Sequence, residues 1–496
     1  MVSTVYKDFQ SPPVVAAWLN DVNNFVYGNV ANVMVFGAKG DGITDDTMAI
    51  QSAIATGKNV YLPQGTYNIS QTLTLNNQHM FGDGQNTTFI NCSNSNTGAV
   101  IVTLGALAFV HDLFLQFMNT NGTSIVTGSE TSGQRVAFLC DGGTYQLQRG
   151  GGVARVKVGE CGTAFFNSTN SATSIFSCHF YDIECQNFSY AGFEFLSPAR
   201  TGNIYQNLYL NSAKWPSITY AFCLAGEESE CRIDQINIES MSCIQGMFLS
   251  GVRAASIGAL HFEECVLNTA DSGLLQWRNS AGEISALTVY YCNINVQDWA
   301  IIKLGDATYT GASANPNTCD WLRIGMLHCK GLNDGNGAVN PGLAALTYTM
   351  YFIDRNAGAN GFLYVQIDSY VWNTFENDAA QYIAFQSDPQ VNISQIASAA
   401  GPVNWGKQIQ QYNGFVHRQD GLTECWGQTN VPSGAVFVQA LPYQYKQYIL
   451  SVDVSSVDST YSVDYRVSWS PYDLVHINLV HTAPSTVTVS WKTLGI

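Results

Sequence analysis

The sequence has little charge, and least of all positive charge. Charged residues make up 12% of the 496 positions, and 21 lysines and arginines stand against 37 aspartates and glutamates, giving a formal net charge of −16. A surface that neutralises nucleic-acid phosphates needs an excess of basic groups. The composition therefore argues against a nucleic-acid partner.

Long apolar runs are also missing. No stretch approaches the ~20 apolar residues that a membrane-spanning helix requires, and the first ten residues, MVSTVYKDFQ, do not start an apolar run of signal-peptide length. We therefore expect neither membrane insertion nor export by a signal peptide.

The thirteen cysteines do not have the spacing of a metal site or of a disulfide framework. Their number is odd, and no Cys-x-x-Cys pair or Cys/His cluster matches zinc spacing. Many stand singly inside apolar segments, as Cys185, Cys223 and Cys292 do. This pattern predicts free thiols in the core of a protein made in a reducing cytosol. We expect no metal and no cofactor.

What the sequence has instead is a strand-and-turn composition with a long repeat. Glycine (44 residues), tyrosine (25) and phenylalanine (25) are abundant, which favours an all-β protein. Strand-like segments with period-two alternation recur about every 27 residues, starting at Ile183, Leu208, Ile236, Leu260 and Leu287. A second set keeps the same period, starting at Gly192, Tyr220, Gly246, Gly273 and Ala300.

Two sets of segments with one period predict a right-handed parallel β-helix, in which each coil adds one rung of about 4.8 Å. Before the repeats, the stretch FGAKGDGITDDTMAIQSAI (residues 36–54) places glycine turns ahead of a short helix at about 45–55, and VYLPQGTYNIS follows as strand, turn and strand. We expect this helix to cap the open end of the apolar solenoid.

The chain divides into three predicted regions. Residues 1–32 form an N-terminal junction with a short amphipathic helix, whose apolar face includes Trp18 and Val22. Residues 33–390 form the β-helix. Residues 391–496 alternate apolar and polar positions without the 27-residue period, which predicts a separate antiparallel β domain for trimerisation or carbohydrate binding.

Three stretches carry a family resemblance. FGAKGDGITDDTMAIQSAI and VYLPQGTYNIS resemble the opening segment of pectate-lyase-type right-handed β-helix proteins, and PPVVAAWLNDVNNFVYGN resembles the junction ahead of the β-helix in bacteriophage tailspikes. ECWGQTNVPSGAVFVQALPYQY and VSWKTLGI resemble tip domains of phage tail fibres. The resemblance implies a homotrimeric virion spike that binds and cleaves a bacterial surface polysaccharide, and that joins the phage tail or baseplate through a missing or short N-terminal region.

The sequence departs from two branches of that family. The Asn-Thr-Asp, Asp-Asp, Gly-His-Gly and Arg-Ile-Lys motifs of β-helix polygalacturonases are not found in the coils, and Asp45-Asp46 belongs to a helix start. The calcium-binding carboxylate cluster of pectate lyases is not recognisable either. Pectin chemistry therefore has no motif to support it.

The candidate catalytic residues follow from the coil pattern. If the apolar positions point inward, then Glu184, Tyr209, Asn237, His261 and Thr288 form one outward row, and Gln186, Asn211, Glu239, Glu263 and Tyr290 form the next. Glu239 and Glu263 are then on adjacent rungs, roughly 5 Å apart. Two carboxylates at that separation suit a retaining glycosidase, and His261 lies on the same face.

Further residues are candidates for substrate binding. Tyr209, Tyr290 and Trp277 offer aromatic platforms for pyranose faces, Asn237 offers a side-chain amide, and Arg253 and Arg278 offer guanidinium groups for an acidic sugar. The acidic loop AGEESEC, with Glu227, Glu228 and Glu230, is interpreted first as a solvated turn and second as a wall of the substrate groove, and Ser240 and Glu264 are placed in turns.

Three functions remain open at this point. A hydrolase uses the paired carboxylates, whereas a lyase removes a proton next to a uronic-acid carboxylate and would use His261 with Tyr209 or Tyr290. A non-catalytic adhesin needs only the aromatic groove. The predicted location is the phage virion, after synthesis in the host cytoplasm.

Overall fold

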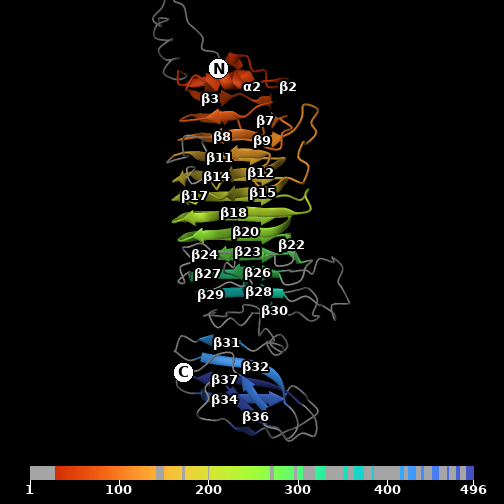
Figure 1. The fold of residues 1–496 in the computed structure, drawn as a ribbon, viewed down its shortest axis with the longest axis vertical. Helices are drawn as coiled ribbons and strands as arrows, with labels where there is room; N and C mark the ends of the chain where they lie inside the picture. The colour runs from red at the N-terminus through yellow and green to blue at the C-terminus, as the bar shows by residue number, and fades with distance from the viewer. Residues whose placement is uncertain are drawn as a thin grey trace, which may run out of the picture.

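The chain is described by a computed structural model (Figure 1). The described residues are 28–140, 150–169, 174–198, 200–267, 273–294, 299–304, 319–330, 350–355, 362–373 and 383–384, together with strands between 414 and 495. The predicted N-terminal helix and the predicted boundary at 390/391 lie outside these residues, so both stay predictions.

The body of the molecule is a solenoid of two parallel sheets, and successive coils stack along its long axis (Figure 1). The first sheet has the order β1 (Val30–Asn32), β3 (Asn59–Leu62), β6 (His79–Gly82), β9 (Phe109–Phe117), β11 (Gly152–Val158), β14 (His179–Gln186), β17 (Asn203–Asn211), β19 (Cys231–Glu239), β21 (Ala255–Glu263), β24 (Ala281–Tyr290), β27 (Cys319–Lys330) and β29 (Phe362–Asn373). On this sheet β2 (Asp41–Asp45), β4 (Gly65–Ile69) and β7 (Thr88–Cys92) pair beside the main path.

The second sheet is formed by the strands that alternate along the chain with those of the first sheet. Its order is β5 (Leu73–Leu75), β8 (Val100–Leu104), β10 (Val136–Leu139), β12 (Cys161–Asn167), β15 (Phe188–Phe195), β18 (Ile218–Glu228), β20 (Ser242–Val252), β23 (Gly273–Arg278), β26 (Trp299–Leu304), β28 (Met350–Arg355) and β30 (Ile383–Ala384). Short strands β13 (Ile175–Phe176), β16 (Arg200–Thr201), β22 (Val266–Leu267) and β25 (Asn293–Ile294) join at its edge. The predicted all-β fold with a parallel β-helix is confirmed.

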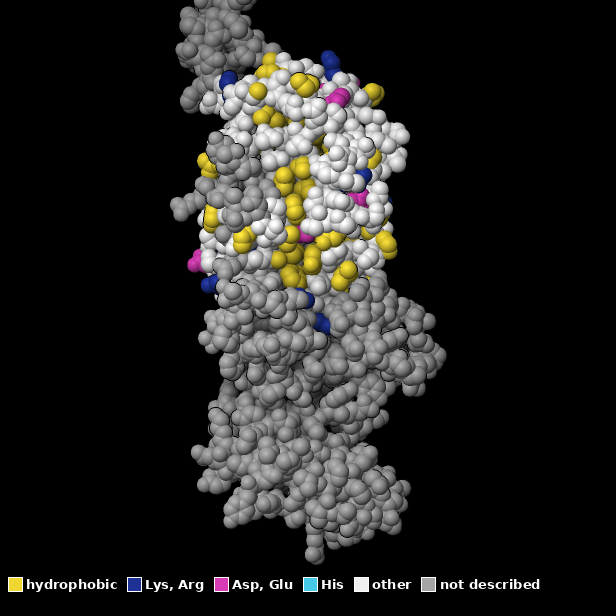
Figure 2. All heavy atoms as spheres, in the orientation of Figure 1, with side chains coloured by type: hydrophobic (Ala, Val, Ile, Leu, Met, Phe, Trp, Pro, Cys, Tyr) yellow, Lys and Arg dark blue, Asp and Glu magenta, His cyan; other side chains and the backbone are white. Residues whose placement is uncertain are grey.

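The core is a set of stacked side chains inside the coils. Because each strand alternates, every second residue points inward and lies over its counterpart on the next rung. The rings of Phe138, Phe165, Phe193 and Phe222 stack in this way, with centroids 4.9, 4.3 and 5.3 Å apart, and all four are fully buried. Outside, hydrophobic side chains also gather in a strip over the strands around β15 and β18 (Figure 2).

The predicted capping helix is present as α2 (Thr47–Ile54), after the 3₁₀ turn η1 (Val33–Phe36). Ile50 and Ala53 are fully buried, and the helix packs on β3 and β5 at the end of the stack (Figure 1). The carboxylate of Asp46 accepts hydrogen bonds from the backbone N–H groups of Lys39 (2.6 Å) and Gly40 (3.0 Å). The glycine-rich turn is therefore held by the helix start that follows it.

Left-handed residues turn the chain from the first sheet to the second. The residue that directly follows each of the strands β14, β19, β21 and β24 has a positive φ. These residues are Asn187 (53°), Ser240 (48°), Glu264 (51°) and Tyr291 (51°). The Ser240 N–H donates to the carbonyl of Glu263 (2.9 Å), and the Glu264 N–H donates to that of Tyr290 (3.1 Å). The predicted turn positions of Ser240 and Glu264 are confirmed.

The cysteines agree with the sequence analysis wherever they are described. Eleven of the thirteen cysteines have side chains that the structure describes, and these eleven are buried and form no disulfide. Burial raises the pKa of the Cys92 thiol to about 11, and the pKa of Cys161 is raised well above its usual range for the same reason. These thiols therefore act as small apolar core residues.

The described C-terminal strands are antiparallel, as predicted. One sheet has the order β31 (Gly414–His417), β32 (Thr423–Val431), β37 (Val487–Gly495) and β34 (Ile449–Ser456), and another has the order β33 (Phe437–Ala440), β36 (His476–Val480) and β35 (Arg466–Ser468). Within the described residues, no helix combines the length and the apolar character needed to cross a membrane.

The aromatic stack makes a prediction about stability. Replacing Phe193 by alanine removes a fully buried ring whose centroid is 4.3 Å from that of Phe165 and 5.3 Å from that of Phe222. We expect the free energy of unfolding to fall by about 3–5 kcal/mol, since the solenoid cannot collapse around the cavity. Denaturant titration measures this change. The exposed outward Ser256→Ala is the control, and an equal loss in both variants would contradict the role of the stack.

Candidate active site

The structure aligns the two outward rows as the repeat predicts. In the first row, each residue pairs with the next one on the adjacent rung, in the order Glu184, Tyr209, Asn237, His261 and Thr288. The neighbouring row runs Gln186, Asn211, Glu239, Glu263 and Tyr290. Glu239 and Glu263 are thus direct partners on adjacent strands.

These side chains point outward because their neighbours fill the core. Ile236 and Ile238 on β19, like Leu260 and Phe262 on β21, are fully buried. The intervening side chains remain accessible, with exposed fractions of 21% for Glu239, 19% for His261 and 36% for Glu263. A substrate can reach all three groups from solvent.

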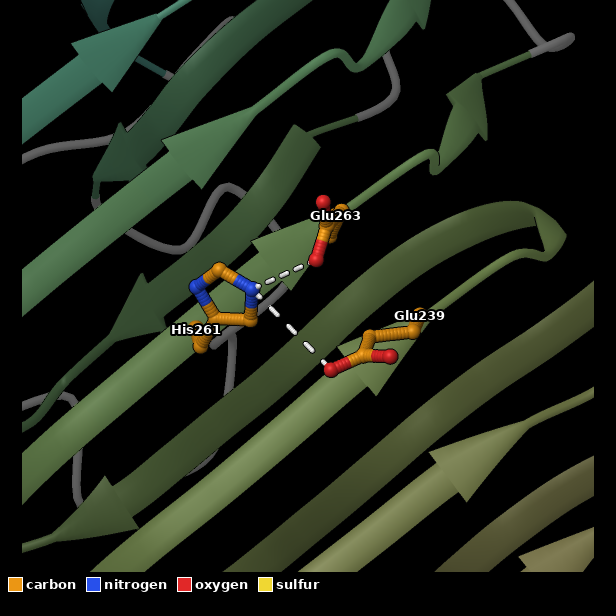
Figure 3. A group of neighbouring side chains, drawn as sticks. All are labelled: Glu239, His261 and Glu263. Atoms are coloured by element: carbon orange, nitrogen blue, oxygen red, sulfur yellow. Dashed lines mark hydrogen bonds and ion pairs between the residues drawn. The ribbon is translucent and has the colours of Figure 1, made fainter.

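His261 lies beside the two carboxylates and directs one ring nitrogen toward both (Figure 3). Its Nε2 is 3.2 Å from Oε2 of Glu263 and 4.0 Å from Oε1 of Glu239. Its Nδ1 is 2.5 Å from Oγ1 of Thr288 on the next rung. The threonine therefore fixes the imidazole so that Nε2 faces the acid pair.

Two tyrosines border this cluster. The hydroxyl of Tyr209 hydrogen-bonds to Glu239, and the pKa of Tyr209 is raised, chiefly because the phenol is partly buried and also because this carboxylate is close. The ring of Tyr290 meets His261 edge-on, with centroids 5.3 Å apart. Tyr209 therefore stays neutral and can donate its hydroxyl proton to Glu239.

His328 belongs to the same surface, although the sequence analysis did not identify it. It pairs in register with Thr288, and its Nδ1 is 2.8 Å from the hydroxyl of Tyr290. It lies about 40 residues beyond Thr288, because a longer connection precedes β27, and this breaks the 27-residue period. The sequence signal for its place is the strand-like alternation of DWLRIGMLHC (residues 320–329), the segment that contains His328.

The cluster has two chemical capacities. Two carboxylates and one imidazole can share protons with a bound substrate. The same groups offer ligand atoms within 4.8 Å of one another, a set of oxygen and nitrogen donors that suits a divalent cation. Glu239 lies on β19, whereas His261 and Glu263 lie on β21, so no short sequence motif contains all three ligands.

The prediction for Trp277 was wrong. Its side chain is fully buried, and its indole N–H donates to the carbonyl of Ser280 at 2.7 Å. Register places it between Leu249 and Leu304, both of which point into the core. Trp277 therefore cannot form a platform for a sugar.

The two arginines lie on another part of the coil. Glu239 ends β19, just before β20 begins, whereas Arg253 directly follows the end of β20. The length of β20 therefore separates Glu239 from Arg253 by on the order of 30 Å. Arg278 ends β23 on the second sheet, and its guanidinium lies 5.0 Å from the ring centroid of Phe248. The structure does not bring these arginines to the acid pair, because the turn after Glu239 separates the two sets of strands.

The acidic loop is only partly a solvated turn. Glu230 is exposed, as predicted. Glu228 is fully buried, and its carboxylate contacts the guanidinium of Arg200 at 3.1 Å and accepts from the side-chain amide of Asn203 at 3.1 Å. The prediction for Glu228 was wrong because the residue ends β18 in register with Arg200.

Comparison with known proteins agrees with this fold. The family model described as rhamnogalacturonase A/epimerase, pectate lyase-like, matches residues 30–266. Alginate lyase 7 of Azotobacter vinelandii is 61% identical over 44 residues, which are 8% of this chain and 5% of that protein. The pre-neck appendage protein of Bacillus phage phi29 is 48% identical over 44 residues, which are 9% of this chain and 5% of that protein.

A solved structure is similar over a longer stretch. The Dettilon tailspike protein has 12% sequence identity and a TM-score of 0.43, with 96% of each chain covered. The curated relatives match over about one twentieth of their own length. The predicted resemblance to pectate-lyase-type β-helix proteins is confirmed by the family match, which covers a little under half of the chain, and a short segment resembles a phage appendage protein.

Proposed function

We propose that this protein is a phage tailspike that recognises and depolymerises a bacterial surface polysaccharide, capsule or O-antigen, by endo-glycosidic hydrolysis. The observation that carries the proposal is the outward pair Glu239 and Glu263, in register on adjacent rungs with His261 beside them. The family model and the alginate lyase match support a carbohydrate substrate. The phage appendage match supports a place in the virion.

The separation of the two carboxylates favours a retaining mechanism. Their nearest ligand oxygens lie within 4.8 Å of each other. Retaining glycosidases hold their carboxyl groups ≈5–5.5 Å apart, whereas inverting enzymes need ≈6.5–9.5 Å to admit a water molecule. One carboxylate then attacks the anomeric carbon, while the other acid protonates the leaving oxygen and later activates water.

We assign the two roles from the contacts of each carboxylate. Glu239 accepts a hydrogen bond from the hydroxyl of Tyr209, which suits a nucleophile held in one position. Oε2 of Glu263 lies 3.2 Å from Nε2 of His261, whose Nδ1 contacts Thr288. We therefore assign Glu263 the role of the acid and His261 that of the group that orients it.

The remaining outward residues form the substrate surface. Asn237 lies between Tyr209 and His261 in register, and we propose that its amide contacts the sugar beside the acid pair. Tyr209 and Tyr290 flank the cluster with partly exposed rings, which suit the apolar faces of pyranoses. We propose that three copies assemble into the spike, and that the chain joins the phage tail through its N-terminal side.

A lyase is the second candidate, favoured by His261 and Tyr209 on one face. Proton abstraction next to a uronate requires a cation that neutralises its carboxylate. The two arginines suggested for this task follow strands of the second sheet, and Lys157 lies 3.2 Å from Glu184. Because these cationic groups lie away from His261 or contact another carboxylate, we favour hydrolysis over elimination.

The acid pair predicts the effect of two substitutions. Glu239→Gln removes the proposed nucleophile, and Glu263→Gln removes the proposed acid. We therefore expect the rate of cleavage of the susceptible polysaccharide to fall by about 10³-fold or more in each variant, with binding retained. A panel of capsular and O-antigen polysaccharides is digested, and reducing ends, ultraviolet absorbance and the anomeric configuration of the fresh product are recorded.

Glu184→Gln is the matched control, since Glu184 is an outward glutamate on the same face and pairs with Lys157. It is expected to cleave at the wild-type rate. New ultraviolet absorbance would establish the lyase instead, binding without cleavage would establish an adhesin, and full activity in both variants would refute the site.

Hydrolysis by paired carboxylates needs no cation, which predicts the outcome of metal removal. Treatment with excess EDTA followed by gel filtration should leave the cleavage rate unchanged within about twofold. The rate is measured before treatment, after it, and after adding back Ca²⁺, Mn²⁺ or Zn²⁺. A loss of activity that a metal restores would show that Glu239, His261 and Glu263 act as ligands and would contradict the proposed roles.

A further inference from the structure

His328 lies on the candidate active surface, yet the proposed hydrolysis gives it no role. It belongs to β27, pairs in register with Thr288 of β24, and continues the outward row that contains His261. Its neighbours Leu327 and Cys329 are core residues with exposed fractions of 2% and 0%, so the imidazole points away from the core. His328 is therefore two rungs beyond His261 on the same face.

The imidazole of His328 holds the phenol of Tyr290. Its Nδ1 is 2.8 Å from the Tyr290 hydroxyl oxygen, and the two ring centroids are 5.0 Å apart at an interplanar angle of 82°. The ring of His261, on the preceding rung, meets Tyr290 at 85° with centroids 5.3 Å apart. The phenol thus lies between imidazoles that come from the rungs on either side of it.

The bond to Tyr290 accounts for a histidine at this position. Nε2 of His328 is buried and has no hydrogen-bond partner within the described part of the chain. Thr288, which lies between the two histidines in register, has its hydroxyl 2.5 Å from Nδ1 of His261. Thr288 therefore fixes His261, whereas His328 is linked to the cluster through Tyr290.

A polysaccharide held at the acid pair also covers the next rung. An endo-acting enzyme binds sugars on both sides of the bond that it cleaves. Tyr290 is the register partner of Glu263 on β24, about 4.8 Å further along the axis, and its side chain is partly exposed. A phenol that is already fixed loses little rotamer freedom when a sugar binds, so its hydrogen bond contributes more to affinity.

We infer that His328 is a positioning residue, which fixes the Tyr290 hydroxyl for a hydrogen bond to a sugar hydroxyl in a subsite on the β24 and β27 side of the acid pair. The inference rests on the proposed polysaccharide substrate and adds a specific contact to it. Because this sugar hydroxyl does not react, the contact is equally strong in the bound substrate and in the transition state. Its loss raises KM and leaves kcat unchanged.

The test measures kcat and KM for the susceptible polysaccharide. We expect His328→Leu and Tyr290→Phe each to raise KM by about 3- to 10-fold, the scale of one neutral hydrogen bond, with kcat unchanged within about twofold. His328→Asn keeps a polar atom near the place of Nδ1 and should restore most of the affinity. His328→Gln carries its amide near the place of Nε2 and should behave like His328→Leu. The double variant His328→Leu/Tyr290→Phe should be no worse than Tyr290→Phe, because the two residues act as a unit.

Tyr61→Phe is the matched control, because Tyr61 is a partly exposed tyrosine of the first sheet whose hydroxyl bonds to another side chain, Asp83, at 2.7 Å. It should leave KM unchanged. Thermal unfolding shows whether each variant folds, and His328→Gln gives the result if His328→Leu does not. The same substitutions are also made in the Glu239→Gln background, where Kd for the immobilised polysaccharide is measured without cleavage.

Three results would overturn the inference: a loss of kcat in place of affinity, additive losses in the double variant, or unchanged KM and Kd in His328→Leu and His328→Gln. A wild-type protein that binds a glycan without cleaving it would refute the hydrolase, and the Kd values would still decide the role of His328. A wild-type protein that binds no glycan of the panel would overturn both proposals.

Discussion

The structure depends on hydrogen bonding between strands of successive coils. Parallel pairing fixes each residue opposite one that lies about 27 positions further along the chain, and one register runs through β14, β17, β19, β21 and β24. A slip of one residue would move every inward side chain to the surface. The stacked core therefore holds the register, and the register holds Glu239 opposite Glu263.

The first sheet was predictable because its outward and inward positions alternate without interruption beside the site. Ile236 and Ile238 are buried around Asn237, and the same holds around His261. Sequence reasoning could therefore place Glu239, His261 and Glu263 together. The hydrogen bond from Thr288, the partnership of Tyr209 with Glu239, and the place of His328 depend on side-chain directions and on a longer connection, which the repeat does not encode.

The second sheet was harder to predict because its polar and aromatic residues do not follow the simple rule. Trp277 faces the core, whereas Phe248 and Glu194 face outward yet are almost completely buried. Register shifts on β15 and on β18 change which residues share a face. Glu228 is buried because Arg200 lies in register beside it, a long-range pairing that no local pattern indicates.

The turn between the two sheets fixes where the acid pair lies on the solenoid. The acid pair lies directly before the turn that leads into the second sheet, on strands held by backbone bonds at Ser240 and Glu264. The backbone bonds of the neighbouring coils do not depend on the outward side chains. A substitution of Glu239 or Glu263 should therefore leave the strands in place, so that the effect of the lost carboxylate can be measured by itself.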